Sequence, residues 1–267
     1  RLQTGADSDL TFILSHSHSP KAEDPGALTK LQAESNPQQA NSTNTSYDAG
    51  EEVKEDRIAL IYNKFFSPSH NFSLTTHLNH RLFRNKLPYT SGGSIEFERW
   101  APGIQVRSIF DLKFFDRPSR LIAGADLSFQ NDDRKRFDNN DGTPGDKTLD
   151  RLETVHSIGP YLRAEWHWTP RLEVVGGIRY DRVRFELDDA FLDNGDQSDD
   201  QTFSEFSGTV GSIFHLKESL HIYANVASAF ETPTTTELAK DPNGGSGFNS
   251  DLKPQYSVSY EVGFKRT

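Results

Sequence analysis

Two histidines at alternate positions near the start of the chain are the first residues whose types suggest chemistry. His16 and His18 follow a short apolar stretch, and imidazole is a common metal ligand. The chain has no cysteine, and no cluster of carboxylates completes the pair in sequence. Because a structural metal site needs about four ligands, we interpret both as solvated loop histidines and expect no metal site and no bound cofactor.

The polar run from Asp138 to Gly142, which reads Asp-Asn-Asn-Asp-Gly, resembles part of a calcium loop. In the EF-hand loop the invariant glycine is the sixth residue and the first residue is a carboxylate ligand. With Gly142 as the sixth residue, the first is Phe137, which cannot bind calcium. We therefore interpret this run as a polar turn.

Catalysis by a serine and a histidine is the next chemistry to weigh. The chain holds nine histidines and many serines, so a pair is easy to imagine from sequence, but no Gly-x-Ser-x-Gly nucleophile motif occurs. An interior Ser–His pair in a complete small barrel would favour a hydrolase, which stays open as a second hypothesis. We expect no catalytic residue and no enzymatic activity.

Composition narrows the class of protein. The 267 residues carry a net charge of −10, which argues against nucleic acid as a partner. No apolar run approaches the roughly 18 residues of a membrane helix, and only 34% of the residues are hydrophobic. Nineteen phenylalanines argue against disorder, and the absence of cysteine fits a periplasmic or outer-membrane location. Because residue 1 is Arg, we expect a mature product or a fragment.

The last 48 residues show the elements that would position any site. Leu220, Ile222, Ala224 and Val226 alternate with polar or small residues, and so do Tyr256, Val258, Tyr260, Val262 and Phe264. A period of two predicts β-strands with one apolar face each. Similar patterns predict strands at 9–16, 56–66, 71–83, 95–114, 121–130, 158–168, 172–187 and 206–214.

Between these strands the sequence predicts two kinds of connection. Loops are expected at 17–53, 84–94, 131–151 and 189–200, and short turns near residues 68, 118, 169 and 218. Two breaks in alternation predict bulges, one at Pro102-Gly103 and one near Asp181, after which Val183, Phe185 and Leu187 become the apolar positions.

The spacing of the short turns is informative. They recur about every 50 residues and alternate with longer loops, which is typical of outer-membrane barrels with short periplasmic turns and long extracellular loops. Aromatic residues near the turns would form one membrane-interface girdle; they are Phe65, Phe66, Phe114, Phe115, Trp166, Trp168 and Phe214. A soluble β-sandwich, with these aromatics in its core, is the alternative.

The C-terminal stretch carries a more specific signal. A strand containing Tyr223-Ala224 and ending at Phe230 and Pro233 is followed by Asn249-Ser250-Asp251-Leu252-Lys253-Pro254-Gln255 and then by Tyr260-Glu261-Val262-Gly263-Phe264-Lys265. This order and spacing closely resembles TonB-dependent outer-membrane receptors, with Gln255 where that family usually has Glu. The resemblance covers about 45 residues directly, and the strand pattern upstream extends it.

The resemblance implies a fold and a function. The chain would be all-β: an antiparallel transmembrane β-barrel fragment of about ten strands from a presumed 22-stranded barrel, with residues 1–267 in the barrel domain and the plug and terminal strands missing. It implies a bacterial outer-membrane receptor for a ferric siderophore or a similar scarce chelate. The TonB complex, acting through the missing plug region, and membrane lipid would be its partners.

Polar residues on lumen faces near the long loops are the candidates for ligand contact. We predict that the ligand-facing residues include His77, Asn79, Arg81, Arg182, Arg184 and Asn225. Arginine suits an anionic chelate because its fork pairs with carboxylates or catecholates through two hydrogen bonds. The alternative for each residue is that it lines a wet lumen and pairs with the plug.

The sequence leaves the ligand open. Ferric siderophore uptake is the default implied by the resemblance, and a non-iron cofactor such as cobalamin or pyrroloquinoline quinone is the alternative.

Overall fold

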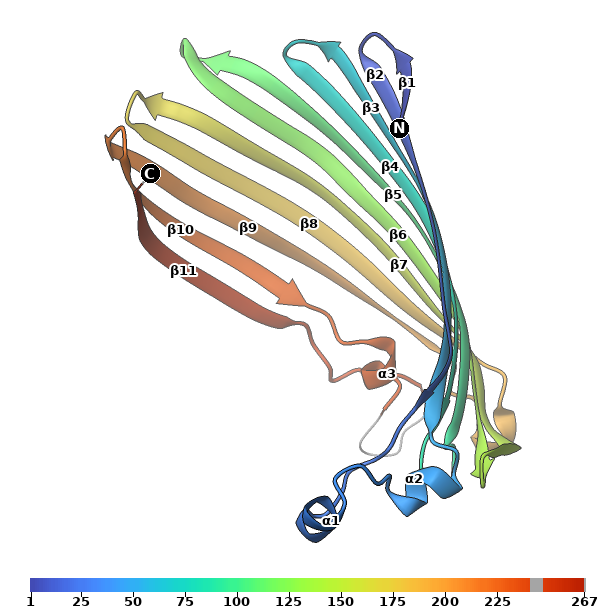
Figure 1. The fold of residues 1–267 in the computed structure, drawn as a ribbon. Coiled ribbons are helices and arrows are strands. Elements are labelled where there is room, and N and C mark those ends of the chain that lie inside the picture. The colour runs from blue at the N-terminus through green and yellow to red at the C-terminus, as the bar shows by residue number, and fades with distance from the viewer. Residues whose placement is uncertain (241–246, 267) are drawn as a thin grey trace.

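The computed structural model describes residues 1–240 and 247–266. They form one antiparallel sheet whose eleven strands lie side by side in chain order, as Figure 1 shows. The strands are β1 (Leu2–Gly5), β2 (Ser8–Glu23), β3 (Gly50–Ser67), β4 (His70–Lys86), β5 (Ser94–Phe114), β6 (Arg117–Asn140), β7 (Thr143–Thr169), β8 (Leu172–Asp189), β9 (Asp199–Lys217), β10 (Leu220–Glu231) and β11 (Gln255–Arg266). The prediction of an antiparallel β-structure with about ten strands is confirmed.

Short helices occur only in the connections among the described residues. They are α1 (Lys30–Ser35), α2 (Ser42–Ser46), the 3-10 helix η1 (Leu192–Asn194) and α3 (Thr235–Leu238). Thr29 and Thr234 begin α1 and α3 with capping boxes, in which the threonine side chain and the residue three positions on satisfy each other's backbone N–H groups. No helix in the described ranges has the length and apolar character needed to cross a bilayer.

The two ends of the sheet differ in their connections. One end carries two-residue turns at 6–7, 68–69, 115–116, 170–171 and 218–219. The turns predicted near 68, 169 and 218 are confirmed, the one expected near 118 lies at 115–116, and the turn at 6–7 was not predicted. The other end carries the loops with α1, α2 and α3 (Figure 1). We call these the turn end and the loop end. At 115–116 both φ angles are positive, as a type I′ hairpin turn requires.

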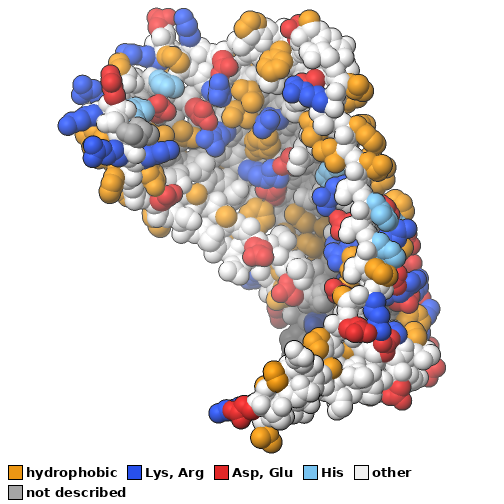
Figure 2. All heavy atoms as spheres, viewed as in Figure 1, with side chains coloured by type: hydrophobic (Ala, Val, Ile, Leu, Met, Phe, Trp, Pro, Cys, Tyr) orange, Lys and Arg blue, Asp and Glu red, His pale blue; other side chains and the backbone are white. Residues whose placement is uncertain are grey.

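The sheet curves, and its two faces differ in chemistry. Figure 2 shows charged side chains spread over the hollowed face, while hydrophobic side chains gather along the outside edge. Strand register explains the division: Ile222 pairs with Phe264 and Val226 with Tyr260 on one face, whereas Asn225 pairs with Glu261 on the other. We call the hollowed face the lumen face and the opposite one the outer face. A single curved layer also excludes the sandwich alternative, because no second sheet covers the outer face of the described strands.

The expected bulge at Pro102-Gly103 is absent. The register of β4 and β5 runs without a shift through Leu78–Pro102 and His77–Gly103. Gly103 serves a different purpose, because a Cβ at this position would lie 2.3 Å from Cε1 of the His77 ring. The glycine therefore makes room for a neighbouring side chain that lies flat against the strand.

The bulge expected near Asp181 is also absent. β8 and β9 stay in one register from Leu172 to Leu187, so Val183 and Phe185 face the lumen by simple alternation. They are apolar because loop residues cover them. Phe185, Leu187 and Phe203 form a buried cluster with Leu238 and Phe248 of the β10–β11 connection. The lumen face of β8 therefore becomes apolar at these positions because the β10–β11 connection, and not water, covers it.

One predicted loop is largely strand, and another begins with strand residues. Residues 131–151 form the long ends of β6 and β7, joined by a turn at Asp141-Gly142 where both φ angles are positive. β2 extends to Glu23, so the histidines interpreted as loop residues lie in a strand. His16 Nδ1 is 2.6 Å from Asp56 Oδ1 on β3. No group of three potential metal ligands lies together in the described part of the chain.

Aromatic residues gather on the outer face at the turn end. Phe114 and Trp168 both contact Trp166, with ring centroids 5.1 and 4.7 Å away, and Phe66 contacts His70. Phe65 is an exception to the predicted girdle, because it pairs with Asn71 on the lumen side. The remaining aromatics form the interface belt expected of a membrane barrel.

The two faces make a direct stability test possible. Leu74 lies on the outer face midway between the aromatic belt and Leu78, while its neighbour Thr75 faces the lumen opposite Gln105. Leu74→Arg should lower the unfolding free energy in lipid vesicles by about 2–4 kcal/mol, because the guanidinium must enter hydrocarbon. Thr75→Arg should cost under about 1 kcal/mol, since water reaches it. Equal losses, measured by urea titration, would contradict the assignment of the faces.

Candidate ligand-facing surface of the lumen

Four arginines from four adjacent strands meet on the lumen face at the loop end. Arg81 of β4 pairs in register with Arg99 of β5, and Arg134 of β6 pairs with Arg151 of β7. Alternation and register place all four on the lumen face. Arg81 and Arg99 lie an even number of residues from the lumen-facing Thr75 and Gln105, and Arg134 pairs with Phe97, two residues from Arg99. We call this group the arginine cluster.

Two buried carboxylates hold part of the cluster. Asp132 accepts two hydrogen bonds from Arg99, at 2.7 Å from Nε and 2.6 Å from Nη2. Glu153 accepts from Arg151 Nε at 2.7 Å and lies 3.3 Å from Arg134 Nε. Both acids are only 1% exposed, so these pairs are fixed parts of the wall and are poorly screened by water.

Two phenylalanines complete the surface. Arg81 Cζ lies 5.6 Å from the Phe83 ring, and Arg99 and Arg134 lie 5.3 and 5.4 Å from the Phe97 ring. Aromatic faces attract cations, but they carry no formal negative charge. Arg81 forms no ion pair with any described residue, and its buried Nε has no hydrogen-bond partner.

The unpaired charge of Arg81 therefore favours an anion. Asp132 and Glu153 pair with Arg99, Arg134 and Arg151, whereas Arg81 has no ion pair among the described residues. Glu55 and Asp189 lie opposite Arg81 and Arg151 in register but form no ion pair with them. Guanidinium groups bind carboxylate and catecholate oxygens through paired hydrogen bonds. Within the described lumen face, the arginine cluster is thus a surface suited to an anionic ligand arriving from the loop end.

The loops above the cluster are fastened to one another. Asn139, which is fully buried, donates from Nδ2 to the backbone oxygens of Tyr47 and Leu87, at 3.1 and 2.9 Å, and accepts from the Gly142 amide at 2.8 Å. One amide thereby joins three connections. Lys86 donates to Asp48 in the β2–β3 connection, and together with Lys21 it holds the pKa of that carboxyl below its ordinary value.

The structure places three predicted site residues together on β4. His77, Asn79 and Arg81 all face the lumen, and Arg81 belongs to the arginine cluster. Asn79 accepts a hydrogen bond from Arg57 Nε at 2.9 Å, and His77 packs on Gly103. The first two therefore already have structural partners, whereas Arg81 keeps its charge available.

The other three candidates lie elsewhere. Arg182 and Arg184 pair in register with Ile158 and His156 and project from the outer face, so their expected lumen position is wrong. The cause is the absent bulge at Asp181. Asn225 does face the lumen, but it pairs with Gly211 in the half of β10 nearer the turn end, where its side chain accepts from Thr209 at 2.8 Å.

Sequence reasoning missed Arg99, Arg134 and Arg151. Two of them lie in residues 131–151, which were interpreted as a loop because charge is dense there. A period of two was present only at Arg151-Leu152-Glu153, because residues 132–136 are charged at every position. Continuous charge is what a strand shows when its lumen face is polar and its outer face extends beyond the lipid.

Comparison with known families agrees with this architecture. A family model described as TonB dependent receptor-like, beta-barrel matches residues 3–266. The chain therefore belongs to the TonB-dependent receptor β-barrel family, whose members lie in the bacterial outer membrane. The turn end is then periplasmic and the loop end extracellular.

Solved structures show the same fold at low sequence identity. The ferric citrate transporter FecA in its unliganded form is similar with a TM-score of 0.83 and 15% identity, over 98% of this chain and 39% of that one. The alcaligin receptor FauA from Bordetella pertussis gives 0.70 and 13%, over 99% and 38%. The ferric-catecholate import receptor Fiu from E. coli K12 gives 0.67 and 14%, over 97% and 46%. This chain thus spans less than half the length of these receptors.

The buried ion pairs of the cluster differ in kind from surface pairs, which gives a second prediction. Asp132→Ala leaves the half-buried Arg99 without its buried carboxylate and should lower the unfolding free energy by about 2 kcal/mol. The matched Asp111→Ala breaks the half-exposed pair with Arg120, 2.7 Å long, and should cost under about 1 kcal/mol. Denaturant titration of both variants measures the difference, and similar losses would show that the cluster is hydrated like the surface.

Proposed function

We propose that the protein is an outer-membrane receptor that takes up a ferric siderophore or a similar anionic chelate. Residues 1–267 supply part of the barrel wall and the extracellular loops. The observation that carries this proposal is the arginine cluster, which faces the lumen at the extracellular end and in which Arg81 has no ion pair with any described residue.

The physical argument concerns specificity for charge. The whole chain is acidic, with a net charge of −10, so its general field repels anions. The arginines gathered in the lumen therefore attract anions locally, against the overall charge of the chain. A siderophore complex with carboxylate or catecholate oxygens presents several acceptors at once, and paired hydrogen bonds from rigid arginines recognise such groups.

Family membership supports a role in uptake driven by the TonB complex. Receptors of this family work with TonB, and the names of the similar structures describe them as a ferric citrate transporter and a ferric-catecholate import receptor. We propose that this protein also engages the TonB complex, through a plug region that the present residues do not include. The role of the chain described here is then to bind and position the chelate.

Arg81 provides the test of the proposed ligand chemistry. In the full-length receptor, Arg81→Gln should raise the Kd of an anionic ferric chelate about tenfold, because one charge-assisted pair of hydrogen bonds is lost. Arg81→Lys should recover only part of the affinity, since a lysine cannot form the planar fork. Arg120→Gln, near the periplasmic turns, is the control and should leave the Kd unchanged.

The ligand is found by growing a deletion strain, complemented with these variants, on a panel of iron chelates and cofactors. Loss of growth on one anionic iron chelate, deepened by Arg81→Gln, supports the proposal. Loss of growth only on cobalamin or another non-iron cofactor, or an Arg81→Gln receptor that binds every anionic chelate normally, would overturn it.

A further inference from the structure

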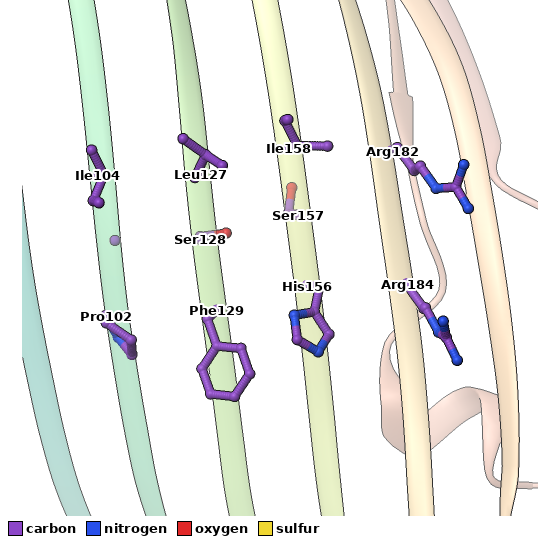
Figure 3. A pocket seen from close by; sticks show the side chains of 11 residues that line it. Pro102, Ile104, Leu127, Ser128, Phe129, His156, Ser157, Ile158, Arg182 and Arg184 are labelled. Carbon is purple, nitrogen blue, oxygen red and sulfur yellow. The ribbon is translucent and has the colours of Figure 1, made fainter.

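A groove of about 530 Å³ lies on the outer face, near the extracellular edge of the apolar surface. Its floor is aliphatic: Ile104, Leu127 and Ile158 follow one another across β5, β6 and β7 in a single row of paired residues. All three are more than 40% exposed, because nothing in the described chain covers them. Figure 3 shows these side chains together on neighbouring strands.

Two arginines form the rim of this groove. Arg182 continues the aliphatic row on β8, and Arg184 continues the next row, which contains Phe129 and His156. In Figure 3 both arginine side chains come from the same strand and point to the same side. Both are exposed on a face that is otherwise apolar toward the turn end.

Only one of these arginines has a carboxylate partner. Arg184 forms ion pairs with Glu186, at 2.7 Å, and with Asp200, at 3.6 Å. Arg182 forms no hydrogen bond or ion pair through its side chain with any residue of the described ranges, and its register partners are Ile158 and Ser204. By contrast, Arg179, three residues earlier on the lumen face, is held by Asp126 and Asp181.

The depth of Arg182 in the membrane decides what it meets. It lies ten residues beyond Leu172, where β8 leaves its periplasmic turn. At ~3.3 Å per residue and a strand tilt of ~40°, this corresponds to roughly 25 Å along the membrane normal, the height of the apolar band of an outer-membrane barrel. The guanidinium groups therefore lie at the level of the lipid headgroups of the outer leaflet.

We propose that this groove binds one phosphate-bearing lipid of the outer leaflet. Arg182 and Arg184 bind the phosphate, and an acyl chain lies along the aliphatic floor of Ile104, Leu127 and Ile158. Charge complementarity selects this occupant. An unpaired arginine at the edge of hydrocarbon is costly, and a phosphate at that depth supplies the missing anion through paired hydrogen bonds. The acyl chain accounts for the aliphatic floor, which a free phosphate ion would leave uncovered.

The site is separate from the proposed chelate site, because it lies on the opposite face of the wall. The test uses the full-length receptor in detergent and three probes: dioleoyl phosphatidic acid, dioleoyl phosphatidylcholine and inorganic phosphate. Native mass spectrometry counts the bound lipids. The variants are the double substitution Arg182→Gln with Arg184→Gln, and Leu127→Ser in the floor. The control is Arg163→Gln, which removes a lumen-facing arginine paired with Glu165.

We expect phosphatidic acid to stay bound to the wild type and to Arg163→Gln, in preference to phosphatidylcholine. The double variant should bind it at least about tenfold more weakly, and Leu127→Ser should also weaken it. Inorganic phosphate at millimolar concentration should not displace it. Circular dichroism melting in detergent identifies any variant that fails to fold, and such a variant is replaced by the single substitution Arg182→Gln.

Three results would overturn the proposal. One is equal retention of phosphatidic acid by the wild type and a folded double variant. Another is displacement of the lipid by inorganic phosphate, which would indicate a free-anion site. The third is equal binding of phosphatidylcholine, which would indicate an apolar surface without selectivity for phosphate. None of these results depends on uptake of a chelate.

Discussion

The hydrogen bonds of the backbone in lipid are the constraint on which this structure depends. Hydrocarbon offers no partner for an unpaired N–H or C=O group, so each membrane strand must pair along its length with both neighbours. The register of β8 and β9 runs unbroken from Leu172 to Leu187, and that of β4 and β5 passes through Pro102 without a shift. Where β5 and β6 leave Ala101 and Pro102 unpaired, the register still does not shift. Each residue's face is therefore fixed by whether its position is odd or even.

Strand register therefore places the arginines on two different faces of the wall. On the lumen face they meet carboxylates or aromatic rings, as Arg99 meets Asp132 and Phe97. There they build a rigid wall with spare positive charge at the extracellular end. On the outer face Arg182 and Arg184 lie where the apolar surface ends. The same side chain thus serves the ligand on one side and the membrane boundary on the other, and only strand register separates the two roles.

Sequence patterns predicted the sheet well where one face is apolar. The strands from Leu220 to Glu231 and from Gln255 to Arg266 were placed almost to their ends, as were the periplasmic turns. The patterns failed beyond the lipid, where both faces of a strand meet water or loops. Residues 131–151 then lose their apolar signal, and Phe185 and Leu187 gain one because Leu238 covers them. Two candidate arginines were consequently assigned to the wrong face, and three arginines of the cluster were missed.

Residues 1–267 contain no cysteine, so single cysteines introduced there can show which way each side chain faces. Spin labels attached to single cysteines along β8, from Ile178 to Phe185 in the full-length receptor in lipid vesicles, report contact with oxygen in the bilayer or with a water-soluble nickel chelate. Our account predicts one uninterrupted alternation, with even positions facing outward throughout and Val183 and Phe185 shielded from oxygen. A reversal of phase at Asp181, with Val183 and Phe185 becoming the oxygen-exposed positions, would contradict it.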